Sequence, residues 1–196
     1  MNNTVPMQKM YFSVGHLPTK EAIEEFILTT VAKMVTIEPA KELAPHALIF
    51  KQGVIKKGKK MVEVTHIGLS LFMGTPMDKA GVVPFLQDLC LAKGVYAVAM
   101  VTEAWLAAAP SYMTMANPVV ADKDRPSNQA MRKEALIVQF EFDGAAPVTH
   151  FAEIRRLVSA QGKRCEVGDW ESADNVAGLL TAGGSILPAK QPIGLA

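Results

Sequence analysis

The chain has 196 residues, of which 49% are hydrophobic and 20% are charged, and its 20 Lys and Arg residues nearly balance its 19 Asp and Glu residues. A formal net charge of +1 excludes the overall positive field of a histone-like nucleic-acid binder and the acidity of a DNA mimic. A chain of this length buries about 70% of its unfolded surface, so its core needs neither a metal nor a disulfide. We therefore expect a globular domain that meets any charged partner through a local patch.

Nothing at the start of the chain resembles a secretory signal peptide, because residues 1–20 lack a continuous apolar core behind a positive start. The longest apolar stretches are interrupted by proline or a carboxylate, short of the roughly 18 residues of a membrane-spanning helix. Cys90 and Cys165 lack the paired spacing of a zinc site. We expect a cytoplasmic protein with no membrane contact, no cofactor and no bound metal.

Two segments have the spacing of amphipathic helices. In residues 19–34 apolar side chains recur every three or four positions, and Thr19 can cap the N-terminus. Residues 76–93 show the same spacing, and Pro84 is expected to kink this helix because it lacks an N–H group.

A β-hairpin is predicted in the lysine-rich part of the chain. Residues 47–52 and 61–73 are rich in strand-forming side chains, and between them Lys57-Gly58 is typical of a hairpin tip. In the second strand the apolar positions change parity after Val64, which predicts a bulge near residues 65–66.

Further strands are predicted at residues 95–106, 134–142, 149–158 and 163–167. The first is apolar at both parities, which is typical of a strand covered on both faces. Residues 149–158 also fit a helix, although we favour a strand. Ser172 can cap a short helix through Leu180.

These elements predict an α+β fold, with a mainly antiparallel sheet of five or six strands and two main helices packed on one face. We expect a single domain over residues 1–182 and an irregular tail over residues 183–196. Residues 107–133 lack periodicity, and an unstructured connection longer than about 12 to 15 residues is usually functional or mobile.

Glu103 stands out because it lies in an otherwise apolar strand, where a carboxylate needs hydrogen bonds or a cation. One interpretation is a general acid or base that works with a histidine, for which His66 is the candidate. The other is a structural ion pair with Arg125, Arg132 or Lys133, of which we favour Arg132.

Residues 51–60 contain five lysines and no acid. Weak electrostatic contact with nucleic acid is therefore one hypothesis, and the residues that would provide it are Lys56, Lys57, Lys59 and Lys60. The hairpin contains no aromatic side chain on which a base could stack, and exposed lysines also protect sheet edges from aggregation.

The long segment 107–133 offers a second candidate surface. The residues that we expect to bind a protein partner are Tyr112, Met113, Met115, Arg125 and Arg132, because flexible apolar side chains beside arginines suit such contacts. With the tail residues Ile186, Leu187, Ile193 and Leu195 they also favour self-association, most simply as a homodimer.

Three short motifs resemble a pattern in uncharacterised bacterial and phage proteins. They are Glu103-Ala104-Trp105, Arg125-Pro126-Ser127 and Arg132-Lys133-Glu134-Ala135-Leu136. No activity is attached to that group, so the resemblance implies a bacterial or phage origin and no catalytic residue.

No phosphate loop, dinucleotide-binding glycine pattern or nucleophile elbow is present in the sequence. By elimination, we expect a non-enzymatic interaction protein, such as a phage or prophage accessory protein that binds a host or viral protein. The alternatives are a small hydrolase-like enzyme that uses Glu103 and a histidine, and an accessory factor that contacts nucleic acid.

Overall fold

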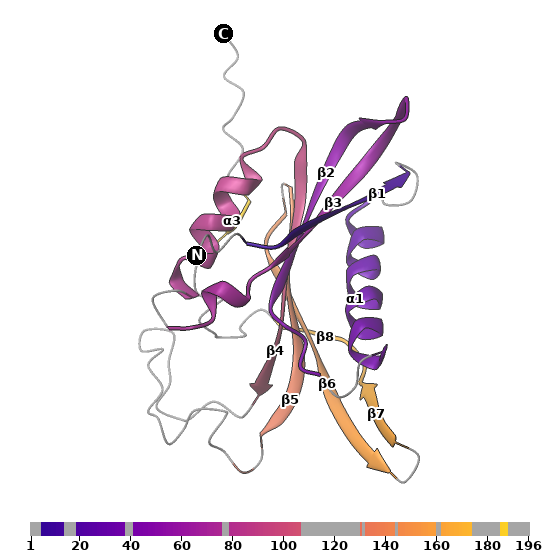
Figure 1. Ribbon diagram of the computed structural model, residues 1–196, viewed down its shortest axis with the longest axis vertical. Helices are drawn as coiled ribbons and strands as arrows, with labels where there is room; N and C mark the ends of the chain where they lie inside the picture. The colour runs from indigo at the N-terminus through magenta and orange to yellow at the C-terminus, as the bar shows by residue number, and fades with distance from the viewer. Residues whose placement is uncertain are drawn as a thin grey trace.

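The computed structural model describes residues 5–13, 19–37, 41–75, 79–106, 130, 132–143, 145–159, 162–173 and 185–187. These residues form one antiparallel sheet with the strand order β1-β3-β2-β4-β5-β6-β7, and β8 also pairs with β6. The sheet curls around helix α1 (Figure 1). The α+β class and the antiparallel sheet are confirmed, but the prediction of five or six strands is too low because the sheet has eight.

The strands are β1 (Met7–Ser13), β2 (His46–Lys56), β3 (Lys59–Gly68), β4 (Val95–Leu106), β5 (Lys133–Phe142), β6 (Val148–Ser159), β7 (Gly162–Val167) and β8 (Glu171–Ala173). The helices are α1 (Lys20–Ile37), the short 3-10 helix η2 (Ser70–Phe72) and α3 (Val82–Cys90). Strands β1 and β8 have no counterpart among the predicted elements. Ser172, the expected helix cap, lies in β8, and residues 174–180 are outside the described part.

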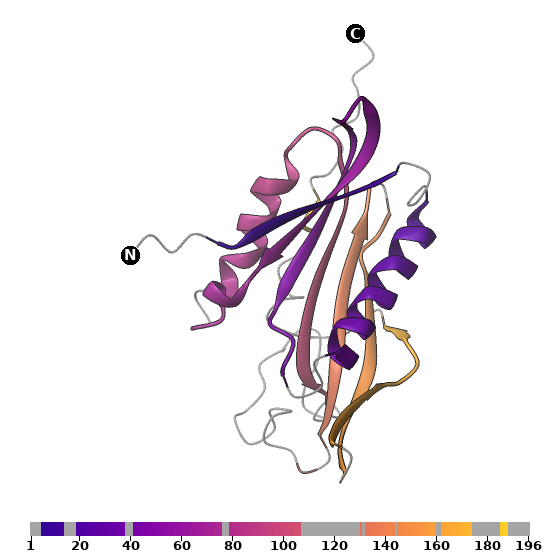
Figure 2. The ribbon, with the colours of Figure 1, turned by 45° about the vertical axis from the view of Figure 1, so that its right-hand side comes forward.

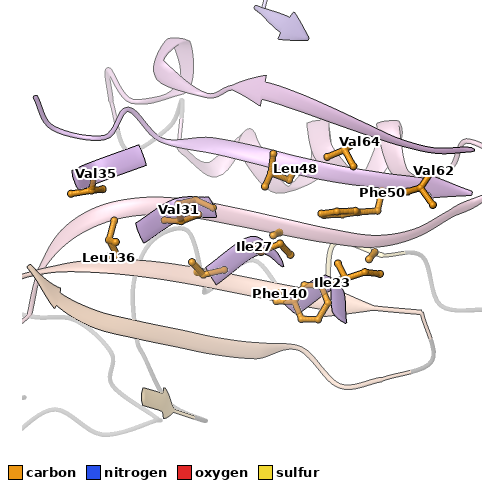
Figure 3. Packing of buried hydrophobic residues seen from close by; sticks show 14 of the residues in the cluster. Ile23, Ile27, Val31, Val35, Leu48, Phe50, Val62, Val64, Leu136 and Phe140 are labelled. Atoms are coloured by element: carbon orange, nitrogen blue, oxygen red, sulfur yellow. The ribbon is translucent and has the colours of Figure 1, made fainter. Parts of the chain in front are cut away.

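The two helices lie on opposite faces of the sheet, so the prediction that both pack on one face is wrong (Figure 2). Side chains of α1 and of six strands form the core on one face, and those labelled in Figure 3 are Ile23, Ile27, Val31, Val35, Leu48, Phe50, Val62, Val64, Leu136 and Phe140. Side chains of α3 form a second core with Ile49, Ile67 and Val98. β4 is apolar at both parities because it lies between these two layers.

Helix α1 begins where its sequence predicts. The Thr19 hydroxyl accepts a hydrogen bond from the Ala22 N–H at 3.3 Å, which is the expected N-cap. The helix predicted over residues 76–93 is interrupted in the structure. Lys79 and Ala80 are helical, with the Lys79 N–H bonded to the Thr75 carbonyl at 3.0 Å, and a turn follows at Gly81. Helix α3 then begins at Val82, so Pro84 lies in its first turn. A first-turn proline costs no helical hydrogen bond, because N–H groups there have no partner within the helix.

The predicted hairpin is confirmed. Lys57 and Gly58 connect β2 to β3, and both have positive φ, 50° and 72°, as the commonest two-residue hairpin turn requires. The bulge predicted at residues 65–66 is wrong, because the register shift lies on the other strand, between Lys51 and Val54. β3 changes its apolar parity without a bulge, since its first half is buried beneath α1 and its last part beneath α3.

The described tail segment is part of the core on the α3 side. Ile186 is 0% exposed, and the carboxylate of Glu141 accepts hydrogen bonds from the Ile186 N–H at 2.8 Å and the Leu187 N–H at 2.9 Å. The Ser185 hydroxyl donates a further bond to the same carboxylate at 2.8 Å. Ile186 is therefore not available for self-association, contrary to our expectation.

Candidate functional site

The hairpin tip carries four lysines, Lys56, Lys57, Lys59 and Lys60, and it projects beyond the neighbouring strands at one end of the sheet (Figure 1). Cross-strand register places its side chains. Tyr11 lies opposite Glu63, Lys56 lies opposite Lys59, and Lys51 also lies opposite Glu63. Because directly opposed residues of an antiparallel pair share a face, these side chains and Lys9 lie on the face that α3 covers further along. We call Lys9, Lys51, Lys56, Lys57, Lys59 and Lys60 the lysine end.

One aromatic side chain, Tyr11, and one acidic side chain, Glu63, contact the lysines on this face. The Lys56 ammonium group lies 3.3 Å from the centroid of the Tyr11 ring, and Lys9 Nζ lies 2.9 Å from Glu63 Oε1. Burial acts to raise the pKa of Glu63, but hydrogen bonds from Lys9 and Tyr11 and the charge of Lys51 hold it below its usual range. Glu63 therefore stays ionised, and it is the one carboxylate that faces these lysines in the described part of the chain.

The remaining lysines have little to offset their charge. Within the described residues no carboxylate lies within ion-pair distance of Lys57, Lys59 or Lys60. Lys56 and Lys59 are directly opposed, an arrangement of like charges that destabilises a sheet. The opposed pair therefore does not stabilise the hairpin, and its lysines are available to contact anions.

Glu103, the other sequence candidate, lies in an ion-pair cluster. Its two oxygens each lie 2.8 Å from Arg156 Nη2, and Oε1 also accepts the Leu43 N–H at 2.8 Å. Arg156 bonds in addition to Glu134 Oε1 at 3.0 Å and to the Lys41 carbonyl at 3.0 Å. The cluster therefore connects β4, β5 and β6 to the segment that follows α1.

The predicted partner of Glu103 is wrong. Glu103 lies opposite Leu136, whereas Arg132 precedes β5. The Arg132 guanidinium instead lies 4.5 Å from the centroid of the Trp105 ring. Arg156 on β6 instead reaches across β5. Burial raises the pKa of Glu103, while the Leu43 N–H and Arg156 act to lower it.

His66 lies beside a second histidine, His46. Its ring centroid is 4.9 Å from that of His46, and the His46 Nδ1 atom lies 3.0 Å from the Ala44 carbonyl oxygen. Burial lowers the pKa of both, that of His46 to about 4. Across the described ranges, no group of three or more His, Cys, Asp or Glu side chains is arranged to hold a metal ion.

A cavity with a volume of about 410 Å³ lies at the end of the sheet away from the lysine end. Its wall includes Glu153, which pairs with Lys133 at 2.8 Å and with Arg155 at 3.1 Å. Neither Glu103 nor His66 lines it. The cavity and the two candidate catalytic residues are therefore separate.

Four of the five residues expected to bind a protein partner, Tyr112, Met113, Met115 and Arg125, lie outside the described residues. The fifth, Arg132, contacts Trp105, which is 41% exposed. Sequence reasoning missed Lys9 and Tyr11, because residues 7–13 were not recognised as a strand. The alternation of Lys9, Tyr11 and Ser13 with Met10 and Phe12 is the signal that could have found it.

The described residues contain no helix that is both long and apolar enough to cross a membrane. Comparison of the chain with models of known families, with curated proteins and with solved structures finds no match.

Proposed function

We propose that the chain is a non-enzymatic interaction protein and that its lysine end binds an acidic surface of a protein partner. The observation that supports this proposal is the concentration of lysines on a projecting hairpin, with like charges directly opposed and, among the described residues, Glu63 alone to offset them. A complementary acidic surface would relieve that repulsion and speed association.

A protein partner fits this end better than a nucleic acid. Residues 1–106 contain no arginine, the side chain best suited to paired hydrogen bonds with phosphate. Ile55, near the hairpin tip, is 71% exposed and adds apolar surface beside Lys60, on the face of the hairpin opposite to Lys56 and Lys59. These two features suit an acidic protein surface with apolar side chains among its carboxylates.

Nucleic acid remains the second candidate, and one observation favours it. Tyr11 supplies the aromatic ring that the hairpin itself lacks, and it lies within the lysine end. Base stacking there would require Lys56 to leave the ring face, since its ammonium group lies 3.3 Å from the centroid. The hydrogen bond between Tyr11 and Glu63 also places a negative charge next to any incoming phosphate.

The test compares two sets of matched lysine substitutions in the full chain. One variant replaces Lys57, Lys59 and Lys60 with Gln, and the control replaces Lys33, Lys79 and Lys163 with Gln, so that both lose the same charge. Binding to labelled polyglutamate and to a single-stranded oligonucleotide is followed by fluorescence anisotropy at increasing salt.

We expect the hairpin variant to bind polyglutamate more than about tenfold more weakly and the control to change less than about twofold. Equal weakening by both variants would show that only net charge matters and would contradict the proposal. Binding of the oligonucleotide alone would favour the nucleic-acid candidate.

A further inference from the structure

The outer side of β1 is an open sheet edge. The Gly68 N–H donates to the Pro6 carbonyl at 3.0 Å, and Met7 then lies opposite Ile67. Along a strand of an antiparallel pair, the N–H and C=O groups of every second residue point toward the partner strand. Since the Pro6 carbonyl points toward β3, the backbone groups of Gln8 and Met10 do so as well. The backbone groups of Met7, Lys9 and Tyr11 therefore point away from the sheet.

These outward groups have no partner in the described structure. No backbone hydrogen bond involves Met7, Lys9 or Tyr11 apart from the pairing of β1 with β3. Peptide groups of this kind on an edge strand can pair with a strand from another chain.

The two edges of the sheet differ in their protection. Of the six residues of β7, Lys163, Arg164 and Glu166 are charged, which is a common way to prevent pairing at an edge. Of the seven residues of β1 only Lys9 is charged, and the strand contains no proline. The β1 edge is therefore the better site for an added strand.

The charges beside β1 indicate what kind of strand it would accept. Lys9 on β1 pairs with Glu63, while Lys51 lies opposite Glu63 and the Lys56 ammonium group reaches the Tyr11 ring. Three lysines therefore share one carboxylate on this face, and the edge keeps a net positive charge. A second copy of β1 would bring another Lys9 toward these lysines, which is unfavourable, whereas a strand with carboxylates on that face would be attracted. Charge complementarity thus favours an acidic occupant over a second copy.

We propose that the β1 edge binds an extended acidic segment of a partner protein as an additional antiparallel strand. This inference rests on the proposed function and adds the binding mode to it. The acidic side chains lie opposite Lys9 and Tyr11, on the face of the lysine end. A partner residue directly opposite Lys9 or Tyr11 exchanges two backbone hydrogen bonds with it, one through its N–H group and one through its carbonyl. The acidic residues of the segment therefore donate their N–H groups to β1.

The test uses a labelled peptide of alternating glutamate and valine and two derivatives that are N-methylated at either the glutamates or the valines. N-methylation removes the N–H group and leaves side chains and charge unchanged. Binding of each peptide to the full chain is measured by fluorescence anisotropy. Sedimentation velocity with and without the peptide reports whether the chain itself occupies the edge.

We expect methylation at the glutamates to weaken binding more than about tenfold and methylation at the valines to have a small effect. Equal binding of all three peptides would overturn strand addition while leaving recognition of acidic partners intact. A dimer that the parent peptide dissociates would overturn the acidic occupant in favour of a second copy. If the chain bound neither these peptides nor polyglutamate, the result would contradict the proposed function itself.

Discussion

The Lys56 ammonium group and the Tyr11 ring lie 3.3 Å apart, which joins the hairpin to the edge strand β1 in one surface. Tyr11 also forms a hydrogen bond with Glu63, its cross-strand neighbour, and that bond together with burial raises the pKa of Tyr11. A basic hairpin and an unpaired sheet edge thereby form neighbouring parts of one candidate binding site.

The Glu103 cluster is expected to act as a structural anchor. Glu103→Ala removes both oxygens that Arg156 and the Leu43 N–H contact, and we expect the free energy of unfolding to fall by about 2 to 3 kcal/mol. Arg156→Ala alone should cost a similar amount, and the double variant should cost less than the sum because both changes break the same contacts.

Chemical denaturation of the four proteins in this cycle measures the coupling. Lys133→Ala is the matched control, since it removes the exposed pair with Glu153 and should cost less than about 1 kcal/mol. Additive effects of Glu103→Ala and Arg156→Ala would show that the two side chains do not act together.

The structure predicts acid sensitivity at His46. Burial depresses its pKa from 6.5 to about 4 in the folded protein, so the unfolded chain takes up the proton first as the pH falls. Its contribution to stability is therefore complete above pH 6.5 and is lost progressively down to about pH 4. The full loss is about 3 kcal/mol.

The variant His46→Leu keeps every carboxylate but lacks this histidine. Comparing its stability with that of the wild type therefore separates the contribution of His46 from that of carboxylates that also titrate in acid. The stability difference between wild type and variant should shift in favour of the variant as the pH falls from 6.5 to about 4. A difference that stays constant over this range would contradict burial as the cause of the low pKa. His66 contributes in the same direction, because burial lowers its pKa too.

Glu141 is expected to hold the tail segment in the α3-side core. Glu141→Gln turns one acceptor oxygen into a donor that faces the N–H groups of Ile186 and Leu187, and we expect a cost of about 2 to 3 kcal/mol. Ile186→Ala should cost about 2 to 5 kcal/mol, because this side chain is 0% exposed.

The double variant Glu141→Gln/Ile186→Ala shows whether the two residues hold one docked segment or make two independent contacts. If either change detaches the segment, the two costs should not add, and the tail should become a site of proteolytic cleavage in both single variants. Full additivity without new cleavage would show that the segment stays in place.

Local signals predicted much of this fold. The cap at Thr19, the two-residue turn at Lys57-Gly58 and the two apolar faces of β4 each depend on neighbouring residues or on a repeating pattern, so the sequence displays them directly. The opposite placement of the helices was not predicted, although the double-sided burial of β4 already required a layer on each face.

The site depends more on long-range pairing, which spacing along the chain does not show. Five strands precede Arg156, and only the register of β4, β5 and β6 brings it to Glu103. In the same way, Tyr11 joins the lysines because β1 pairs with β3 rather than with its neighbour in sequence, β2. The lysines themselves were evident, but their aromatic and acidic neighbours were not.

An NMR titration of the isotope-labelled full chain with the alternating glutamate and valine peptide locates the bound segment residue by residue. If the peptide adds to the β1 edge, the largest backbone amide shifts occur at Met7, Lys9 and Tyr11 and at the hairpin tip around Lys57. Shifts confined to the cavity around Lys133 and Arg155, at the other end of the sheet, would contradict binding at this edge.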